Sequence, residues 1–73
     1  MNFKFTAIIQ KEEDLYVAFC PELDIASQGK TVEEAKRNLE EAVTLFLEHA
    51  SPEEVRERLK GDIYIAPLEV AVA

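Results

Sequence analysis

The side chains that could carry chemistry in this chain are one histidine, one cysteine and 15 carboxylates among 73 residues. His49 stands near the end of a helical pattern, where a histidine interacts favourably with the helix dipole and needs no further role. Cys20 ends an apolar run, which is typical of a small buried side chain and less so of a reactive thiol. A single cysteine excludes an internal disulfide and suits a reducing cytoplasm. Together the two residues cannot supply the ligands of a zinc site.

The carboxylates form two local clusters that could in principle hold a hard divalent ion. Residues 12–14 (Glu-Glu-Asp) make one, and Glu22 with Asp24 makes the other. Neither has the regular ligand spacing of a calcium loop, so solvated turn charges are the simpler interpretation. Gly29 and Gly61 are the only glycines, which excludes a glycine-rich phosphate loop. We therefore expect no metal, no cofactor and no catalytic activity.

The formal net charge of −7, from 15 acidic and 8 basic side chains, is spread along the chain. Residues 1–30 carry −2, residues 31–60 carry −3 and residues 61–73 carry −2. Without a basic block to neutralise phosphates, we expect no direct contact with nucleic acid or with an anionic membrane. A basic protein partner fits the charge better, and solubility alone is the competing explanation.

Apolar runs near the N-terminus predict an antiparallel hairpin. In residues 2–10 apolar and polar side chains alternate, which is the period of a half-buried strand. Residues 11–14 form a polar turn, and residues 15–20 are apolar on both faces, which predicts a central strand covered on both sides. Pro21 ends that strand because it cannot donate to a sheet ladder, and residues 25–27 predict a short third strand.

The longest predicted element is a helix that ends at about His49. Thr31 and Glu34 form a capping box at its start. Apolar residues then recur every three or four positions and give one core-facing stripe. Leu45 and Leu47 widen this stripe beyond what one sheet face needs. They meet either a second helix or another subunit, and the sequence does not separate the two.

A second capped helix and a last strand follow. Ser51 and Glu54 form another capping box, with Pro52 at the first helical position. Residues 63–72 predict a final strand, in which Pro67 requires an edge position or a bulge. The outer part of this strand has few charges and would promote aggregation if left bare, so a second subunit is its expected cover.

These elements predict an α+β fold in a single domain over residues 1–73. The expected sheet is mainly antiparallel with three to four strands, has helices on one face and follows the order β-β-β-α-α-β. So short a chain buries only about 60% of its unfolded surface, which favours a homo-oligomer, a dimer or larger. The N-terminus lacks the apolar core of a signal peptide, and no apolar run approaches the ~20 residues of a membrane span. We therefore expect a cytoplasmic protein.

A recognisable pattern runs from the second strand to the main helix. Its positions are Tyr16–Asp24, Ser27–Gly29, Thr31, Glu34-Ala35, Asn38-Leu39 and Glu41-Ala42. The pattern resembles the signature of HicB-like antitoxins, in a short form with the N-terminal domain alone, and SQGKTVEEAKRNLEEAV (residues 27–43) is its most specific part. The signature residues with a structural cause are Pro21 at the strand end, Gly29 in the turn, Thr31 and Glu34 at the cap, and Ala35 and Ala42 facing the sheet.

The resemblance implies a partial ribonuclease-H-like HicB fold without catalytic carboxylates, usually oligomeric. It also implies binding to a small basic HicA-like toxin, an RNA-cleaving protein of double-stranded-RNA-binding fold, which the antitoxin inhibits by covering its active face. An acidic domain suits that partner because its carboxylates can pair with the toxin's basic side chains, which otherwise bind the phosphates of RNA. Many members of the family carry a C-terminal DNA-binding domain, whereas this chain stops at Ala73, so repression by direct DNA contact is not expected.

The leading hypothesis is therefore a protein-binding antitoxin with a contact surface of exposed carboxylates. The expected contact residues are Glu22, Asp24, Glu33, Glu40 and Glu41, for each of which simple solvation is the competing explanation. The alternative is a standalone oligomeric scaffold or small-ligand-binding domain without a toxin. A magnesium-dependent nuclease is a third hypothesis, and the core-facing side of the first strand argues against it because Phe5, Ala7 and Ile9 carry no carboxylate.

Overall fold

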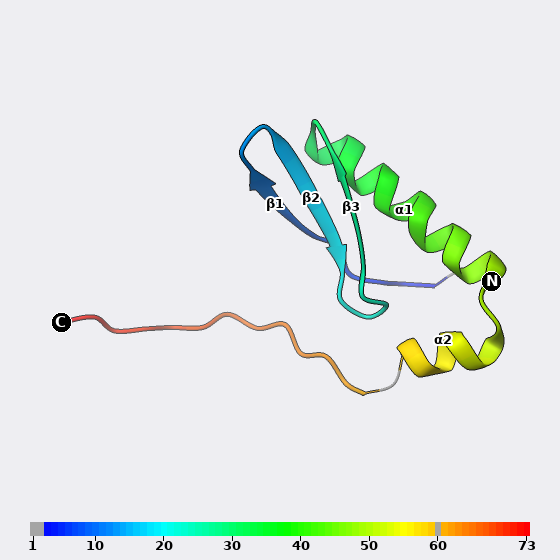
Figure 1. Ribbon diagram of the computed structural model, residues 1–73. Coiled ribbons are helices and arrows are strands. Elements are labelled where there is room, and N and C mark those ends of the chain that lie inside the picture. The colour runs from blue at the N-terminus through cyan, green and yellow to red at the C-terminus, as the bar shows by residue number, and fades with distance from the viewer. Residues whose placement is uncertain (1–2, 60) are drawn as a thin grey trace.

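A three-stranded antiparallel sheet with one long helix packed against it forms the body of the molecule (Figure 1). The computed structural model describes residues 3–59 and 61–73. The strands are β1 (Ile8–Glu12), β2 (Leu15–Cys20) and β3 (Ile25–Gly29), and the helices are α1 (Val32–His49) and α2 (Pro52–Arg58). The predicted α+β class and the β-β-β-α-α order are confirmed. Within the described residues no helix is long and apolar enough to cross a membrane.

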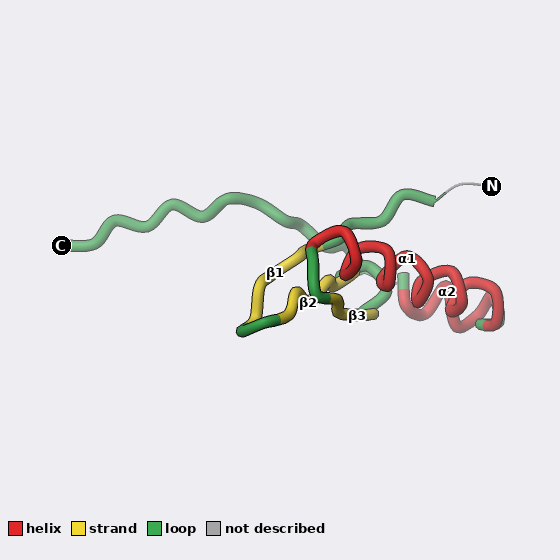
Figure 2. Tube along the Cα trace, turned by 90° about the horizontal axis from the view of Figure 1, so that it is seen from above, coloured by secondary structure: helices red, strands yellow, loops and turns green. Residues whose placement is uncertain are grey.

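The central place of β2 in the sheet is also confirmed, since β1 and β3 pair with it on either side. Alternate residues of β2 face opposite ways. Tyr16, Ala18 and Cys20 lie on the face that α1 covers, and Leu15, Val17 and Phe19 lie on the other. No helix of the described chain covers that second face, so its three side chains are only half-buried (Figure 2). The expectation that β2 is covered on both sides is therefore wrong.

The first strand begins at Ile8, later than the expected start at residue 2, which lies outside the described residues. Residues 3–7, the N-terminal segment, belong to no strand because β2 has only Cys20 beyond Phe19, the partner of Ile8, and Pro21 then turns the chain away. At its other end β1 continues further than expected. The hairpin turn therefore shrinks from residues 11–14 to residues 13–14.

The hydrophobic core lies between α1 and the sheet. Its buried members are Ala18, Cys20, Leu23, Ala35 and Leu39. The sequence placed Leu23 in a connection between strands, yet it is the largest side chain without exposed surface. The turn after β2 folds it inward, so one loop residue supplies much of the apolar volume of a small core.

Gly29 is needed where α1 begins, for a reason other than the expected turn. It is the last residue of β3 and does not take a left-handed conformation. A Cβ atom at this position would lie 2.5 Å from the backbone nitrogen of Ala35, closer than any carbon can approach. Only glycine therefore lets the start of α1 lie directly against β3.

The start of α1 is capped by the two predicted residues, with one change of partner. The Thr31 hydroxyl accepts a hydrogen bond from the Glu34 amide at 3.0 Å, as in a capping box. The Glu34 carboxylate, however, accepts from the amide of Lys30 at 3.0 Å, one residue before the cap. The Asn38 side chain then donates to the Gln28 carbonyl at 2.7 Å and ties the helix to β3.

The second helix is short and is held by its last residue. Ser51 and Glu54 form the full predicted capping box. The Arg58 guanidinium donates to the Leu23 carbonyl at 2.6 Å and lies 5.1 Å from the ring centre of Phe46. Arg58 thus joins α2 to both the β2–β3 connection and α1.

The predicted last strand is not formed. Residues 61–73, called here the C-terminal arm, run out from α2 without joining a helix or strand (Figures 1 and 2). Gly61 takes a φ of +90° at the start of the arm, and every residue of the arm is exposed. A strand exists only where a neighbouring strand accepts its backbone hydrogen bonds, and the arm has no such neighbour in its own fold.

Candidate partner-binding site

The outer side of α1 carries a row of exposed carboxylates. The acidic helix face is the name used here for Glu33, Glu40, Glu41 and Glu48. The adjacent Glu40 and Glu41 follow Glu33 by seven and eight residues, and Glu48 follows Glu41 by seven, which is about two turns of a helix each time. All four side chains are exposed. Three of the five predicted contact residues therefore share one surface, and Glu48 is a fourth member that the sequence analysis missed although the spacing could have found it.

An apolar side chain lies at the border of the acidic helix face. Leu45 is 56% exposed and lines a shallow hollow together with Arg37, Glu40, Glu41 and Thr44. It does not belong to the hydrophobic core. An exposed leucine among charges is the arrangement of an interface anchor with a polar rim, so this residue extends the candidate site.

Glu22 is not a free surface carboxylate, contrary to expectation. It is half-buried and accepts hydrogen bonds from the Thr6 amide at 3.0 Å and from the Thr6 hydroxyl at 2.6 Å. Partial burial opposes ionisation, but the hydrogen bonds from Thr6 outweigh it and lower the pKa of the Glu22 carboxyl. This residue fastens the N-terminal segment to the end of β2, and it has no part in the acidic helix face.

Asp24 is exposed, as expected, but lies in the β2–β3 connection and so apart from the helical carboxylates in the fold. Its φ of +56° is a left-handed conformation that aspartate tolerates better than most residues. Its carbonyl also lies 3.4 Å from the Arg58 guanidinium. The residue type at this position is therefore explained by the turn.

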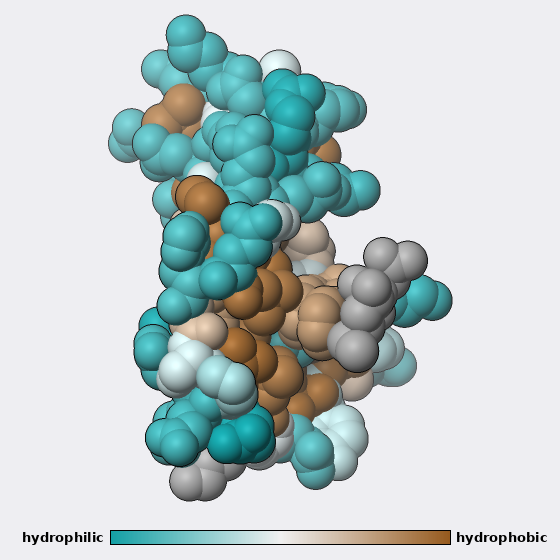
Figure 3. Space-filling model, turned by 90° about the vertical axis from the view of Figure 1, so that its right-hand side faces the viewer, coloured by the Kyte–Doolittle hydropathy of each residue, from teal (hydrophilic) through white to brown (hydrophobic). Residues whose placement is uncertain are grey.

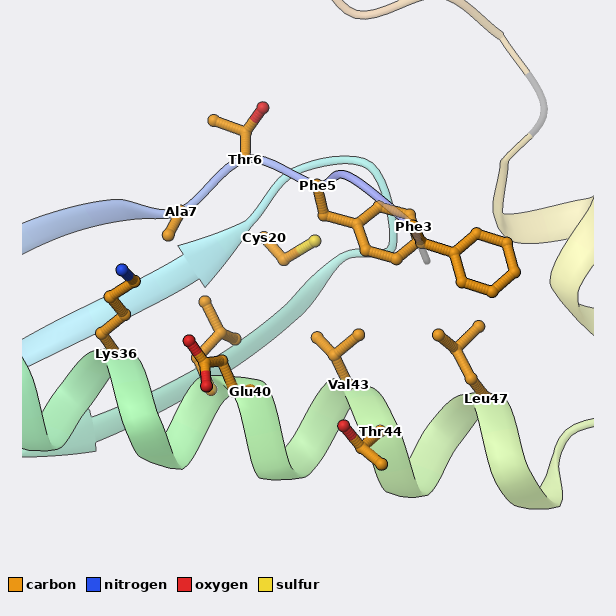
Figure 4. A pocket seen from close by; sticks show the side chains of 11 residues that line it. Phe3, Phe5, Thr6, Ala7, Cys20, Lys36, Glu40, Val43, Thr44 and Leu47 are labelled. Carbon is orange, nitrogen blue, oxygen red and sulfur yellow. The ribbon is translucent and has the colours of Figure 1, made fainter. Parts of the chain in front are cut away.

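A second surface feature, an apolar groove, opens between the N-terminal segment and α1 (Figure 4). Its hollow measures about 530 Å³. The apolar side chains along it are Phe3, Phe5 and Ala7 from the N-terminal segment, Cys20 from β2, and Leu39, Val43 and Leu47 from α1. Figure 3 shows apolar side chains gathered in a band on this side of the molecule, between hydrophilic margins.

The groove exists because α1 packs mainly on β3 and β2 and barely reaches β1. Phe3 is 54% exposed and stacks on Phe5 with ring centres 5.8 Å apart, so the aromatic pair shields only part of the groove. Leu47, whose role the sequence left open, points into it (Figure 4). The widened apolar stripe of the helix indicated that Leu47 has a contact outside the core. It could not show that this contact is a groove, because helical spacing does not reveal how far the sheet extends beneath the helix.

The floor of the groove contains the one cysteine. Cys20 is fully buried, and burial is the main cause that raises the pKa of its thiol. The neighbouring Glu22 carboxylate adds to this effect through a hydrogen bond and its negative charge, while backbone hydrogen bonds oppose it. The thiol is therefore protonated at neutral pH, and the interpretation as a small buried side chain is confirmed.

The residues of the sequence signature surround the junction of β3 and α1. Gly29 and Ala35 make the close contact there, and Thr31 and Glu34 cap the helix. Ala42 is half-buried two turns further along α1, and Pro21 lies in the turn after β2. These positions account for the signature as packing and capping. Among the described residues, no group of three or more His, Cys, Asp or Glu side chains is placed to hold a metal ion.

Comparison with known proteins finds similar small chains in bacteria. The sequence is 44% identical over 68 residues to a UPF0150 protein of Helicobacter pylori, a match that covers 92% of this chain and 94% of that protein. It is 39% identical over 72 residues to UPF0150 protein ssr1765 of Synechocystis sp., covering 96% and 90% of the two chains. A second Synechocystis protein, ssl0738, is 46% identical over 50 residues. No family model and no solved structure matches the chain.

Proposed function

This chain belongs to the UPF0150 family of small proteins, and from that premise we propose that it is an antitoxin-like protein-binding domain. It neutralises a small basic RNA-cleaving toxin of the HicA type in the cytoplasm by covering the toxin's active face, and it catalyses nothing itself. The family name carries no activity, so the proposal rests on the surface of the molecule and on the resemblance of residues 27–43 to HicB-like antitoxins.

The observation that carries the proposal is the acidic helix face. Four exposed carboxylates lie along one side of a single helix, around the exposed Arg37 and with Leu45 at their border. A toxin that cleaves RNA must present cations to the phosphates of its substrate. A row of carboxylates on a helix offers these cations an alternative set of negative charges, without the cost of ordering a flexible segment.

At this surface, electrostatic attraction and the burial of apolar area would affect different steps of binding. The carboxylates raise the rate of encounter with a basic partner and exclude acidic ones, and this contribution weakens as salt screens the charges. The apolar anchor Leu45 supplies area removed from water, which slows dissociation. Binding is therefore expected to weaken with salt without being abolished by it.

A pull-down of the tagged full-length protein from extract of its own cells tests the proposal, at low and at high ionic strength. We expect a small basic protein to be retained at low salt and depleted at high salt. Failure to retain any such protein at low salt would contradict the proposal. The retained protein, once purified, should lose its ribonuclease activity when the full-length chain is added.

A pair of charge-reversal variants locates the contact. The variant Glu40→Lys/Glu41→Lys reverses two charges on the acidic helix face, and we expect it to weaken binding by about tenfold or more. The matched control Glu12→Lys/Glu13→Lys makes the same change in net charge at the β1–β2 turn, away from α1. Equal losses in the two variants would show that net charge alone, and not this face, is recognised.

A second candidate function is favoured by the apolar groove. A hollow of about 530 Å³ with apolar walls is of the size that holds a small molecule. A standalone small-ligand-binding domain or oligomeric scaffold would use the groove, which shares only Glu40 with the acidic helix face. Native mass spectrometry of the purified protein separates the candidates, because a retained metabolite supports the second and a retained basic protein supports the first.

A further inference from the structure

The C-terminal arm is apolar, extended and not paired with any strand of residues 3–59. Leu68, Val70 and Val72 alternate with Glu69 and Ala71, which is the period of a strand with one buried face. These three apolar side chains are 87%, 69% and 88% exposed. The backbone hydrogen-bonding groups of the arm also belong to no ladder. A segment with this pattern requires a sheet edge and an apolar surface beside it.

We propose that the C-terminal arm of one copy of the chain adds a strand at β1 of a second copy and packs its apolar side into that copy's groove, the second copy returning its own arm in the same way. The two copies thus form a dimer by exchange of arms. This inference does not depend on the proposed function.

Of the two sheet edges, β1 is the one left open. The outer edge of β3 lies against α1, and the Asn38 side chain already donates to the carbonyl of Gln28 there. Along β1 the helix makes few contacts, and the apolar groove lies beside residues 3–7, which lead directly into this strand. A strand added at β1 would gain backbone hydrogen bonds from the edge and an apolar contact from the groove at once.

Charge also favours β1 as the docking edge. Between residues 3 and 11 the only charged side chains are Lys4 and Lys11, β1 then ends at Glu12, and the groove is lined by both Lys36 and Glu40. The arm carries Asp62 and Glu69 and no basic residue. An acidic arm is attracted to Lys4 and Lys11, which lie just before β1 and on it, whereas β3 itself offers no charged residue.

The exchange between copies follows from where the arm lies and from how small the core is. In Figures 1 and 2 the arm extends away from the body and ends clear of β1 of its own chain. Among the described residues, the core of the body contains no buried side chain larger than leucine. Two copies that exchange arms complete each other's sheets in one symmetric interface, a low-cost route to a dimer. Pro67 is compatible with this place because the added strand becomes the new edge.

Substitutions at two adjacent residues of the arm test the proposal, because adjacent side chains of a strand point to opposite faces. The variant Val70→Asp places a charge on the side that enters the groove, and the matched control Ala71→Asp places the same charge on the other side. By light scattering, we expect the wild-type chain and A71D to have about twice the 8.3 kDa chain mass. For V70D we expect the dimer dissociation constant to rise by about a hundredfold or more.

A mixing experiment separates exchange between copies from closure of the arm on its own chain. The variant Leu47→Asp blocks the groove, and Leu45→Asp is its control on the exposed side of the same helix. V70D has an intact groove and L47D an intact arm, so each alone should be monomeric and an equimolar mixture should form a heterodimer held by one arm. In a homodimer of V70D neither arm is intact, and in a homodimer of L47D neither groove is intact, so no arm can dock. Circular dichroism of each variant confirms that the body is folded.

Amide hydrogen exchange then places the arm. We expect amides of β1 to exchange at least about tenfold more slowly in the wild-type dimer than in V70D, with β3 unchanged. A monomeric wild-type chain with a protected β1 would mean that the arm closes on its own chain. A dimer that survives V70D, or protection that appears at β3, would show that another surface joins the copies. Each of these results overturns the proposal.

Discussion

At the end of β2, the Glu22 carboxylate accepts hydrogen bonds from both the amide and the hydroxyl of Thr6, sixteen positions earlier in the chain. These bonds hold the N-terminal segment beside α1 and so shape one wall of the groove. Charge-assisted hydrogen bonds of this kind are stronger than neutral ones. A residue that the sequence presents as part of an acidic surface therefore acts inside the fold.

The lowered pKa of Glu22 makes part of the stability dependent on pH. Because its pKa lies below the ordinary value of 4.5 in the folded protein, the ionised carboxylate stabilises the fold above about pH 4.5, and this contribution is lost as the pH falls through the folded pKa. We expect Glu22→Gln to be less stable than the wild type at neutral pH and the difference to shrink in acid. Urea denaturation of the two proteins between about pH 3 and pH 7 measures this.

A substitution at Thr6 serves as the control for this effect. Thr6→Val removes the hydroxyl donor, so Glu22→Gln should cost less in that background, whereas Thr6→Ser keeps the donor and should leave the cost unchanged. If the loss caused by Glu22→Gln is the same at every pH, the carboxylate gains nothing from its ionised form and the assignment of its role is wrong.

Among the elements, α2 is joined to the rest of the fold through its last residue, Arg58. Its capping box is local and explains why the helix forms. Its place beneath the β2–β3 connection is set by Arg58, which reaches the Leu23 carbonyl and the face of the Phe46 ring. The exposed Leu59, at 42%, adds little burial. The C-terminal arm begins three residues after Arg58.

Loss of this contact should destabilise the whole domain measurably. We expect Arg58→Ala to lower the free energy of unfolding by about 1–2 kcal/mol, since it removes a charge-assisted hydrogen bond and a cation–π contact. Arg58→Lys should recover only part, because an ammonium group cannot bond the carbonyl and cover the ring in the same geometry. Urea denaturation of each variant gives the values.

The matched control is Arg56→Ala, which removes the same charge from the last turn of α2. A loss in Arg56→Ala as large as that in Arg58→Ala would attribute the effect to helix charge and not to the contact with Leu23 and Phe46.

For the whole molecule, a body with so small a core gains stability from association. If two copies exchange arms, the folded dimer is favoured by mass action, and its thermal midpoint rises with protein concentration. We expect a rise on the order of a few degrees for each tenfold increase, and none in Val70→Asp. Calorimetry over a range of concentrations measures the slope. A midpoint of the wild-type chain that does not change with concentration would contradict association as a source of stability.

Local order in this protein was predictable from the sequence. The bounds of β2, the end of α1, the capping box of α2 and Thr31 as the cap of α1 were correct, because each depends on hydrogen bonds and side-chain periodicity within a few residues. The return bond of Glu34 goes instead to Lys30. The same holds for the acidic helix face, which follows from helical spacing alone. Glu33, Glu40 and Glu41 were found in this way.

Tertiary structure alone decided which residues meet across the fold. The bond between Thr6 and Glu22, the inward turn of Leu23 and the contact of Gly29 with α1 join residues whose spacing carries no period. The last strand was predicted from the alternation of apolar and other side chains in residues 63–72. This alternation shows that the segment is able to form a strand, but not that a partner strand is present. Whether a strand forms depends on a free sheet edge within reach, and in this chain the open edge beside the groove does not receive its own arm.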